Sequence, residues 1–193
     1  MSNFKDLRTQ DISQGVLSNA YHDTQPLVDL TSPALQMVNN FTLKDPMRAH
    51  YETTIVDALQ KTASKKTDFI LVVDDNEKLL GIVSSADLQS SKIMILAQRL
   101  NVTRAEVNLR HVMTPLNHLM GVSMQSISYA CIGDALQTME HHGVMFLLVT
   151  TAKNEICGLL SAREIAKTLQ IPVHISPIAH SFSEVMEHIE HPH

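Results

Sequence analysis

The chain repeats one eight-residue phrase at a fixed distance. Residues 81–88 read GIVSSADL, and 77 positions later residues 158–165 read GLLSAREI. The same displacement places IVDALQ at 55–60 on IGDALQ at 132–137 without a gap. Repetition at a fixed period indicates a duplicated supersecondary unit. The chain is therefore predicted to contain two copies of one fold, each with too small a core to be stable alone.

Each copy is predicted to contain a helix followed by a hairpin. Residues 54–64 space their apolar side chains at helical intervals. FILVV at 69–73, matched by FLLVT at 146–150, is a short continuous apolar run typical of a strand buried on both faces. The polar turn DDNEK then leads into LLGIVS at 79–84, matched by ICGLLS at 156–161, so the two strands are expected to pair.

The remaining parts of the unit are a first strand and a last helix. The strand is expected near Pro46–Tyr51, and the helix after Ser84. That helix is expected to carry an inward apolar stripe made of Leu88, Ile95, Leu96 and Leu100. The unit then reads strand, helix, strand, strand, helix. The predicted fold class is α+β, with two such repeats packed by pseudo-twofold symmetry.

These patterns divide the chain into five segments. We expect an N-terminal arm at 1–29, a first repeat at 30–100, a linker helix at 101–110, a second repeat at 111–171 and a His-rich tail at 172–193. In the linker, Thr103 followed by Glu106 is a capping box that opens a short helix. The tail is expected to be solvated, and metal binding by its clustered histidines is left open.

Composition limits the possible functions. The 193 residues are 44% hydrophobic and 18% charged, as in ordinary globular proteins, and the net charge of −5 without a basic block argues against nucleic-acid binding. No apolar stretch approaches the roughly 18 residues of a membrane span, and no signal peptide is evident, so a cytoplasmic protein without a membrane partner is expected. The sequence contains no nucleophile elbow, P-loop, dinucleotide fingerprint or HExxH, so we do not expect an enzyme.

In this combination the sequence resembles a pair of CBS domains, the cystathionine-β-synthase-type repeats that form a Bateman module. The phrase G-[IL]-[VL]-S-x-x-[DE]-[LI] occurs twice, each time after a DAL helix and an apolar hairpin, and VMTP at 112–115 opens the second unit. The resemblance covers roughly residues 30–170 and is to stand-alone bacterial members. It implies two clefts that bind adenine nucleotides or related adenosyl ligands, and a homodimer.

The resemblance also implies roles for particular residues. Asp87 becomes the acceptor for a ribose diol, with Ser84 as its hydroxyl partner. The adenine is expected to lie against Thr67, Asp68 and Phe69, with Met47 and Arg48 close by. A capping box explains the same serine and acid without any ligand, because the serine caps the helix and the acid at N3 bonds back. Such a box stabilises a helix by about 0.5–2 kcal/mol.

The second cleft is expected to differ from the first. Glu164 follows Ser161 where Asp87 follows Ser84, and its side chain is one methylene longer. A contact with the diol would then need a shifted backbone or another ligand. Arg163 matches a basic residue of many family members, and it could donate to a phosphate from either cleft.

Two hypotheses of function follow. In the first, the chain is a sensor: an adenosyl ligand in a cleft between the repeats changes their packing, and a downstream protein reads the change. The candidate ligands are AMP, ADP, ATP, NAD and S-adenosylmethionine, and no firm cofactor is assigned. In the second hypothesis, the chain is a ligand-free homodimeric scaffold in which the two S-x-x-D/E phrases only cap helices.

Overall fold

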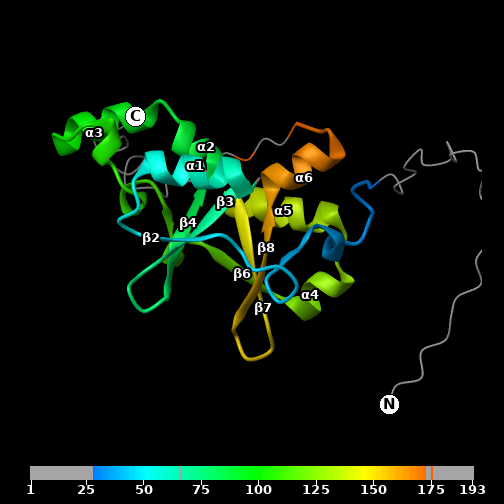
Figure 1. Ribbon diagram of the computed structural model, residues 1–193. Helices are drawn as coiled ribbons and strands as arrows, with labels where there is room; N and C mark the ends of the chain where they lie inside the picture. The colour runs from blue at the N-terminus through cyan, green and yellow to red at the C-terminus, as the bar shows by residue number, and fades with distance from the viewer. Residues whose placement is uncertain (1–27, 66, 173–174, 176–193) are drawn as a thin grey trace, which may run out of the picture.

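The structure is a computed structural model that describes residues 28–65, 67–172 and 175 (Figure 1). Within these residues the strands form two four-stranded sheets. The first sheet, in the order β2-β3-β4-β5, consists of β2 (Arg48–His50), β3 (Phe69–Val73), β4 (Leu79–Ser84) and β5 (Thr114–Pro115). The second, in the order β1-β8-β7-β6, consists of β1 (Asn39–Asn40), β8 (Ile156–Ser161), β7 (Phe146–Thr150) and β6 (Met120–Ser123).

Helices connect the strands of both sheets. The α-helices are α1 (Ile55–Lys65), α2 (Ser85–Gln89), α3 (Lys92–Leu100), α4 (Met124–Tyr129), α5 (Ile132–His142) and α6 (Ala162–Leu169). Four 3-10 turns complete the described chain: η1 (Ala34–Met37), η2 (Arg104–Glu106), η3 (Leu109–His111) and η4 (Leu116–His118). None of the described helices is long and apolar enough to cross a membrane.

The two repeats have the predicted order of elements. The first runs β2-α1-β3-β4-α2, and the second runs β6-α5-β7-β8-α6, with α4 inserted after β6. In each repeat the first strand is parallel to the second, and the second is antiparallel to the third. Even the irregularity of the hairpin recurs, between Val72 and Val73 in one copy and between Val149 and Thr150 in the other. The α+β fold class is confirmed.

The apolar strands are buried on both faces, as their composition predicts. In β3, Ile70 and Val72 belong to the core beneath the helices of the first repeat, while Phe69 and Leu71 belong to the core between the two sheets. Alternation along the strand explains this division, because successive side chains point to opposite faces. A continuous apolar run is therefore what a strand between two cores needs.

A shared core lies between the two repeats, and its residues are related by pseudo-twofold symmetry. It is formed by Phe69, Leu71 and Ile82 from the first repeat and by Phe146, Leu148 and Leu159 from the second. The members of each pair lie 77 positions apart in the sequence. The rings of Phe69 and Phe146 meet edge to face, with their centroids 6.4 Å apart. Such aromatic pairs favour this geometry over flat stacking.

Each sheet is completed by a strand from outside its own repeat. β5 pairs with β4 of the first repeat, and β1, which precedes β2 in the chain, pairs with β8 of the second. The repeated phrase begins with glycine because these strands approach so closely. A Cβ at Gly81 would overlap the carbonyl oxygen of Thr114, and a Cβ at Gly158 would lie 2.9 Å from Val38 Cγ1.

The last helix of the first repeat differs from its prediction. The helix is broken at Ser90, which caps α2 with extended backbone, and α3 begins two residues later. The break shifts the inward face, so that Ile93 is buried whereas Ile95 is 44% exposed. The predicted stripe was therefore wrong at Ile95, since it assumed one continuous helix.

The linker and the ends of the chain complete the description. The Thr103 amide and hydroxyl both donate to Glu106 Oε2, at 2.8 and 2.7 Å, and the short helix η2 begins there as predicted. The five-segment division of the chain stays a prediction, although η1 and β1 pack on the second repeat. Most of the predicted arm and tail, with the tail histidines, lies outside the described residues.

Candidate ligand-binding clefts

Two clefts hold most of the predicted site residues. The first cleft has a volume of about 210 Å³ and is lined by Asp68, Ser84, Ala86, Asp87, Thr114, His118, Leu119, Gly143, Val144, Met145, Phe146, Ser161 and Arg163. The second cleft has a volume of about 280 Å³ and is lined by Val38, Asn39, Asn40, Phe41, Leu43, Lys44, Asp45, Pro46, Met47, Lys65, Thr67 and Phe69. Within the described part of the chain, no group of three or more metal-ligating side chains comes together.

Asp87 is the central acceptor of the first cleft. Its Oδ2 accepts from the Ser84 amide at 2.9 Å and from the Ser84 hydroxyl at 2.6 Å, while the Asp87 amide donates to Ser84 Oγ at 3.0 Å. These contacts form the predicted capping box. They use one carboxylate oxygen, and Oδ1 has no hydrogen-bond partner among the described residues. The cap therefore leaves half of the carboxylate available to a ligand.

The other walls of the first cleft come largely from the second repeat. The segment 143–146 leads from the end of α5 into β7, and Arg163 lies in the first turn of α6. Arg163 is exposed and forms no ion pair with the described residues. Leu119, Val144 and Phe146 contribute apolar surface. The cleft thus combines an acceptor from the first repeat with a cation and apolar side chains from the second.

The predicted adenine-contacting residues are not all brought to Asp87. Asp68 lines the first cleft with Ser84, Asp87, Ser161 and Arg163. In contrast, Met47, Thr67 and Phe69 line the second cleft. These three residues do not line the cleft that contains Asp87, and whether they contact an adenine stays a prediction. The start of β3 nevertheless lies beside the start of α2, because Phe69 pairs with Ser84 and the Ser85 amide donates to the Asp68 carbonyl at 2.9 Å.

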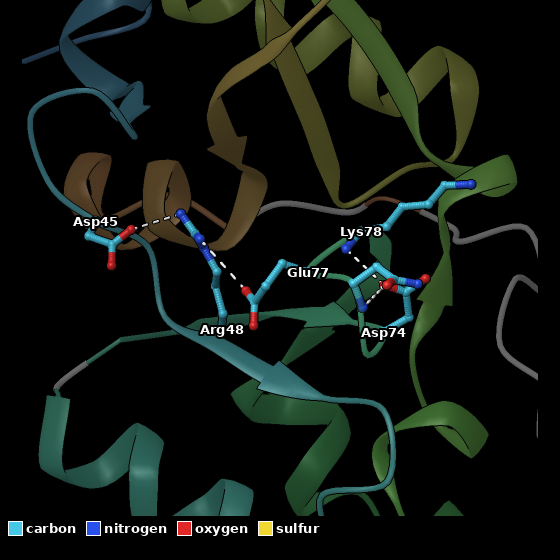
Figure 2. A network of polar contacts seen from close by, with 6 residues as sticks. Asp45, Arg48, Asp74, Glu77 and Lys78 are labelled. Atoms are coloured by element: carbon cyan, nitrogen blue, oxygen red, sulfur yellow. Dashed lines mark hydrogen bonds and ion pairs between the residues drawn. The ribbon is translucent and has the colours of Figure 1, made fainter.

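Arg48 lies outside both clefts. Its guanidinium reaches Asp45 at 2.9 Å and Glu77 at 3.8 Å on the surface of the first repeat, as Figure 2 shows. Glu77 lies in the hairpin turn between β3 and β4, where Asp74 accepts from the Lys78 amide (Figure 2). Arg48 thus pairs with surface carboxylates, and its predicted role beside an adenine stays a prediction.

The second copy of the acidic phrase has a different geometry. Ser161 Oγ accepts from the Glu164 amide at 3.4 Å, but no return bond from Ser161 to the Glu164 carboxylate occurs in the described structure. The complete capping box predicted for both copies is therefore present in the first copy only. Glu164 Oε2 accepts instead from Asn39 Nδ2 at 2.5 Å.

Burial perturbs the ionisation of Glu164. Desolvation raises the pKa of this carboxyl, the hydrogen bond from Asn39 lowers it, and the charge of Asp68 raises it further. The cations of Lys167 and Lys44 lower it by smaller amounts. The net pKa is above the ordinary value for glutamate. Burial therefore disfavours the Glu164 carboxylate, and the side-chain amide of Asn39 is the main group that stabilises it.

Several residues of the first cleft could have been found from the sequence but were not. Val144, Met145 and Phe146 are the copies of Thr67, Asp68 and Phe69 under the 77-residue displacement. Exchanging the two copies would have placed them beside Asp87. Thr114, His118 and Leu119 carry no comparable sequence signal, because the pairing of β5 with β4 brings this segment to the cleft.

Comparisons with known proteins agree with this fold. Residues 38–91 match the family model of the CBS domain. No curated protein matches the sequence. Among solved structures, an uncharacterized conserved protein from Pyrococcus horikoshii is similar, with a TM-score of 0.52 and 14% identity over 76% of this chain and 98% of that chain.

Two further structures are similar at slightly lower TM-scores. CBSX2, solved in complex with AMP, has a TM-score of 0.49 and 21% identity over 72% of this chain and 96% of that chain. A hemolysin-like protein containing a CBS domain from Oenococcus oeni PSU has a TM-score of 0.49 and 16% identity over 72% of this chain and 92% of that chain. The match to the CBS domain model falls in the first repeat. Since the second repeats its strand and helix order, the chain has the fold of a tandem CBS module.

Proposed function

We propose that the chain is a regulatory sensor that binds an adenosyl ligand in the first cleft, with Asp87 as the acceptor for the ribose hydroxyls. The observation that carries this proposal is the carboxylate itself. Oδ2 is fixed by two bonds from Ser84, and Oδ1 is left without a partner among the described residues in a cleft of about 210 Å³. A carboxylate fixed in this way is preorganised to accept hydrogen bonds from a vicinal diol.

The rest of the first cleft suits the other parts of such a ligand. Leu119 and Val144 offer apolar surface for a base, and Arg163 offers a charge-assisted donor for a phosphate. Arg163 is the only Lys or Arg among the residues lining this cleft, so a ligand with one phosphate fits its charge better than one with three. AMP is therefore the first ligand to test, before ADP, ATP, NAD and S-adenosylmethionine.

A signal can arise because the cleft spans both repeats. A ligand on Asp87 touches the first repeat, and the same ligand against segment 143–146 touches the second. Binding then favours one relative arrangement of the repeats, by no more than the ligand's differential affinity for the two arrangements. We place the sensor in the cytoplasm as a homodimer, where a downstream protein reads the arrangement. The two cysteines, Cys131 and Cys157, form no disulfide and suit that compartment.

Thermal unfolding of the full chain tests the proposal. Each ligand is added to wild type, Asp87→Ala and Glu164→Ala, and every shift is measured against the same variant without ligand. At about 100 times its Kd a ligand adds about 2.7 kcal/mol, which for this size means a shift of roughly 5–10 °C. We expect that shift with one ligand in wild type and Glu164→Ala, and its loss in Asp87→Ala.

The control variant removes the acid at the same position of the repeated phrase, so a loss of shift confined to Asp87→Ala reports the site and not the motif. An undiminished shift in Asp87→Ala would contradict the assignment of Asp87. Absence of any shift across the ligands in a folded wild type would favour the ligand-free homodimeric scaffold.

A further inference from the structure

We propose that Asn39 closes the second cleft to ribosyl ligands, so that each chain binds one adenosyl ligand and not two. This inference rests on the proposed function, because it compares the second cleft with the first as a ribose site. In this proposal Asn39, which precedes both copies of the repeated phrase in the sequence, determines how many ligands the module binds.

The first step of the argument is the asymmetry of the two acids. Asp87 and Glu164 occupy the same position of the phrase, 77 residues apart. Asp87 bonds back to its own Ser84 and lines the first cleft. Glu164 accepts from Asn39 Nδ2 at 2.5 Å, and it is Asn39, not Glu164, that lines the second cleft. The amide N–H therefore takes the place that a ribose hydroxyl would take.

The second step is that Asn39 is held firmly in place. Its backbone pairs with Leu159 as part of β1, and two residues further the Phe41 amide donates to the Cys157 carbonyl at 2.9 Å. Gly158 lets this strand lie close to β8. The backbone of Asn39 therefore cannot withdraw from Glu164 without breaking the pairing of β1 with β8, and a ligand that enters must displace the Asn39 side chain.

The third step is that the first cleft has no such obstacle. Thr114 lines it from β5, the strand that pairs with β4 as β1 pairs with β8. In the described structure Thr114 makes no hydrogen bond with Asp87, whose bonds run to Ser84 alone. The strand that accompanies β8 thus occupies its acid, Glu164, whereas the strand that accompanies β4 leaves Asp87 available.

The fourth step concerns what displacement would cost. Burial raises the pKa of Glu164, and the bond from Asn39 is the largest influence that opposes this effect. A ribose that replaced the amide would have to supply the same donors and would leave the Asn39 side chain without its partner. Leaving a polar group unsatisfied weakens binding by about tenfold or more. The second cleft is therefore expected to stay without ribosyl ligand at concentrations that fill the first.

Titration calorimetry of the full chain with AMP tests the inference, with S-adenosylmethionine as the probe where AMP gives no thermal shift. We expect one equivalent for wild type, two for Asn39→Ala, and one again for the double variant Asn39→Ala with Glu164→Ala. The control is Asn76→Ala, which removes an exposed asparagine from the turn between β3 and β4 that lines neither cleft. This control is expected to bind one equivalent.

Each contrary result has a distinct meaning. Two equivalents in wild type, or one equivalent in folded Asn39→Ala, would overturn the inference and leave the proposed function intact. If Asn39→Ala does not fold, Glu164→Ala alone decides, because removing an acid that ligands do not use should change the affinity less than twofold. A loss of tenfold or more in that variant would overturn the inference. Absence of binding in every variant would instead remove the proposed function and the inference with it.

Discussion

The two copies of the acidic phrase share a backbone and differ in what their acids do. Asp87 closes a reciprocal capping box with Ser84 and keeps one oxygen at the surface of the first cleft, whereas Glu164 leaves Ser161 without a return bond and contacts Asn39. The extra methylene of glutamate lengthens the reach of the carboxylate beyond its own helix turn. One difference in side-chain length thus separates an acid that serves its own helix from an acid that ties two segments together.

The comparison teaches that a repeat conserves its fold more easily than its site. The pairs that form the shared core, such as Phe69 with Phe146, remain apolar and equivalent in position. The cleft residues do not match: Thr67 and Asp68 correspond to Val144 and Met145. Packing constrains both copies alike, but a ligand needs only one complete set of contacts.

Close strand approach gives the largest expected difference between the copies. A Cβ at Gly81 would lie 2.4 Å from the backbone oxygen of Thr114, which cannot move without breaking the pairing of β4 with β5. At Gly158 the contacts are looser, with a side-chain methyl of Val38 at 2.9 Å and the backbone oxygen of Asn39 at 3.0 Å. We expect Gly81→Ala to lower the free energy of unfolding by about 2–3 kcal/mol and Gly158→Ala by about 1 kcal/mol. Urea denaturation of the two variants measures this difference, and equal losses would contradict it.

Capping gives the next difference. Ser84 both accepts from the Asp87 amide at 3.0 Å and donates to its carboxylate at 2.6 Å, while Ser161 only accepts, at 3.4 Å, from the Glu164 amide. We expect Ser84→Ala to cost about 1–2 kcal/mol and Ser161→Ala about 0.5 kcal/mol. Chemical denaturation midpoints at constant slope would report this order. A larger loss for Ser161→Ala would show that its capping bond is the stronger one.

The smallest expected effect is a dependence on pH. Because the pKa of Glu164 is raised in the folded state above its ordinary value of 4.5, the folded protein holds this proton more tightly than the unfolded chain. Glu164 therefore reduces stability progressively as pH rises from about 4.5 through the raised pKa. The stability of Glu164→Gln relative to wild type should rise over that range, as measured by urea denaturation at a series of pH values.

Glu106→Gln is expected to show the opposite dependence of stability on pH. Hydrogen bonds from the Thr103 amide and hydroxyl lower the pKa of Glu106 below 4.5. Its carboxylate stabilises the fold above pH 4.5, and that contribution is lost as pH falls through the lowered pKa. The variant should therefore become less stable relative to wild type as pH rises toward 4.5. A pH profile for Glu164→Gln that falls in parallel with that of Glu106→Gln would show that the bond from Asn39 outweighs the burial of Glu164.

Much of the fold follows from the sequence because the repeat constrains it twice. Any assignment for 69–73 must also hold for 146–150, and the apolar runs in both allow only doubly buried strands. The break at Ser90 escaped prediction because nothing in SADLQSSKIM forbids a continuous helix. Propensity is local, whereas the direction of α3 is set by what it packs against.

The clefts were predicted less well than the fold. The capping serine and acid of the first copy have local signatures, so Ser84 and Asp87 were identified together and lie together. The remaining walls depend on which repeat faces which, and this is a property of packing between distant segments. The contact of Asn39 with Glu164 spans 125 positions and joins residue types that carry no pairing signal. Whether the assigned residues bind a ligand stays a prediction.

The pairing of β1 with β8 and of β5 with β4 also has a consequence for synthesis on the ribosome. The first sheet can close as soon as β5 has emerged, because its other strands precede it in the chain. β1 must wait for β8, since Asn39 pairs with Leu159, 120 positions later. At ordinary elongation rates that delay is about 6–24 s. During this interval the segment that later fills the second cleft is a strand without its sheet, available to chaperones or to another nascent copy.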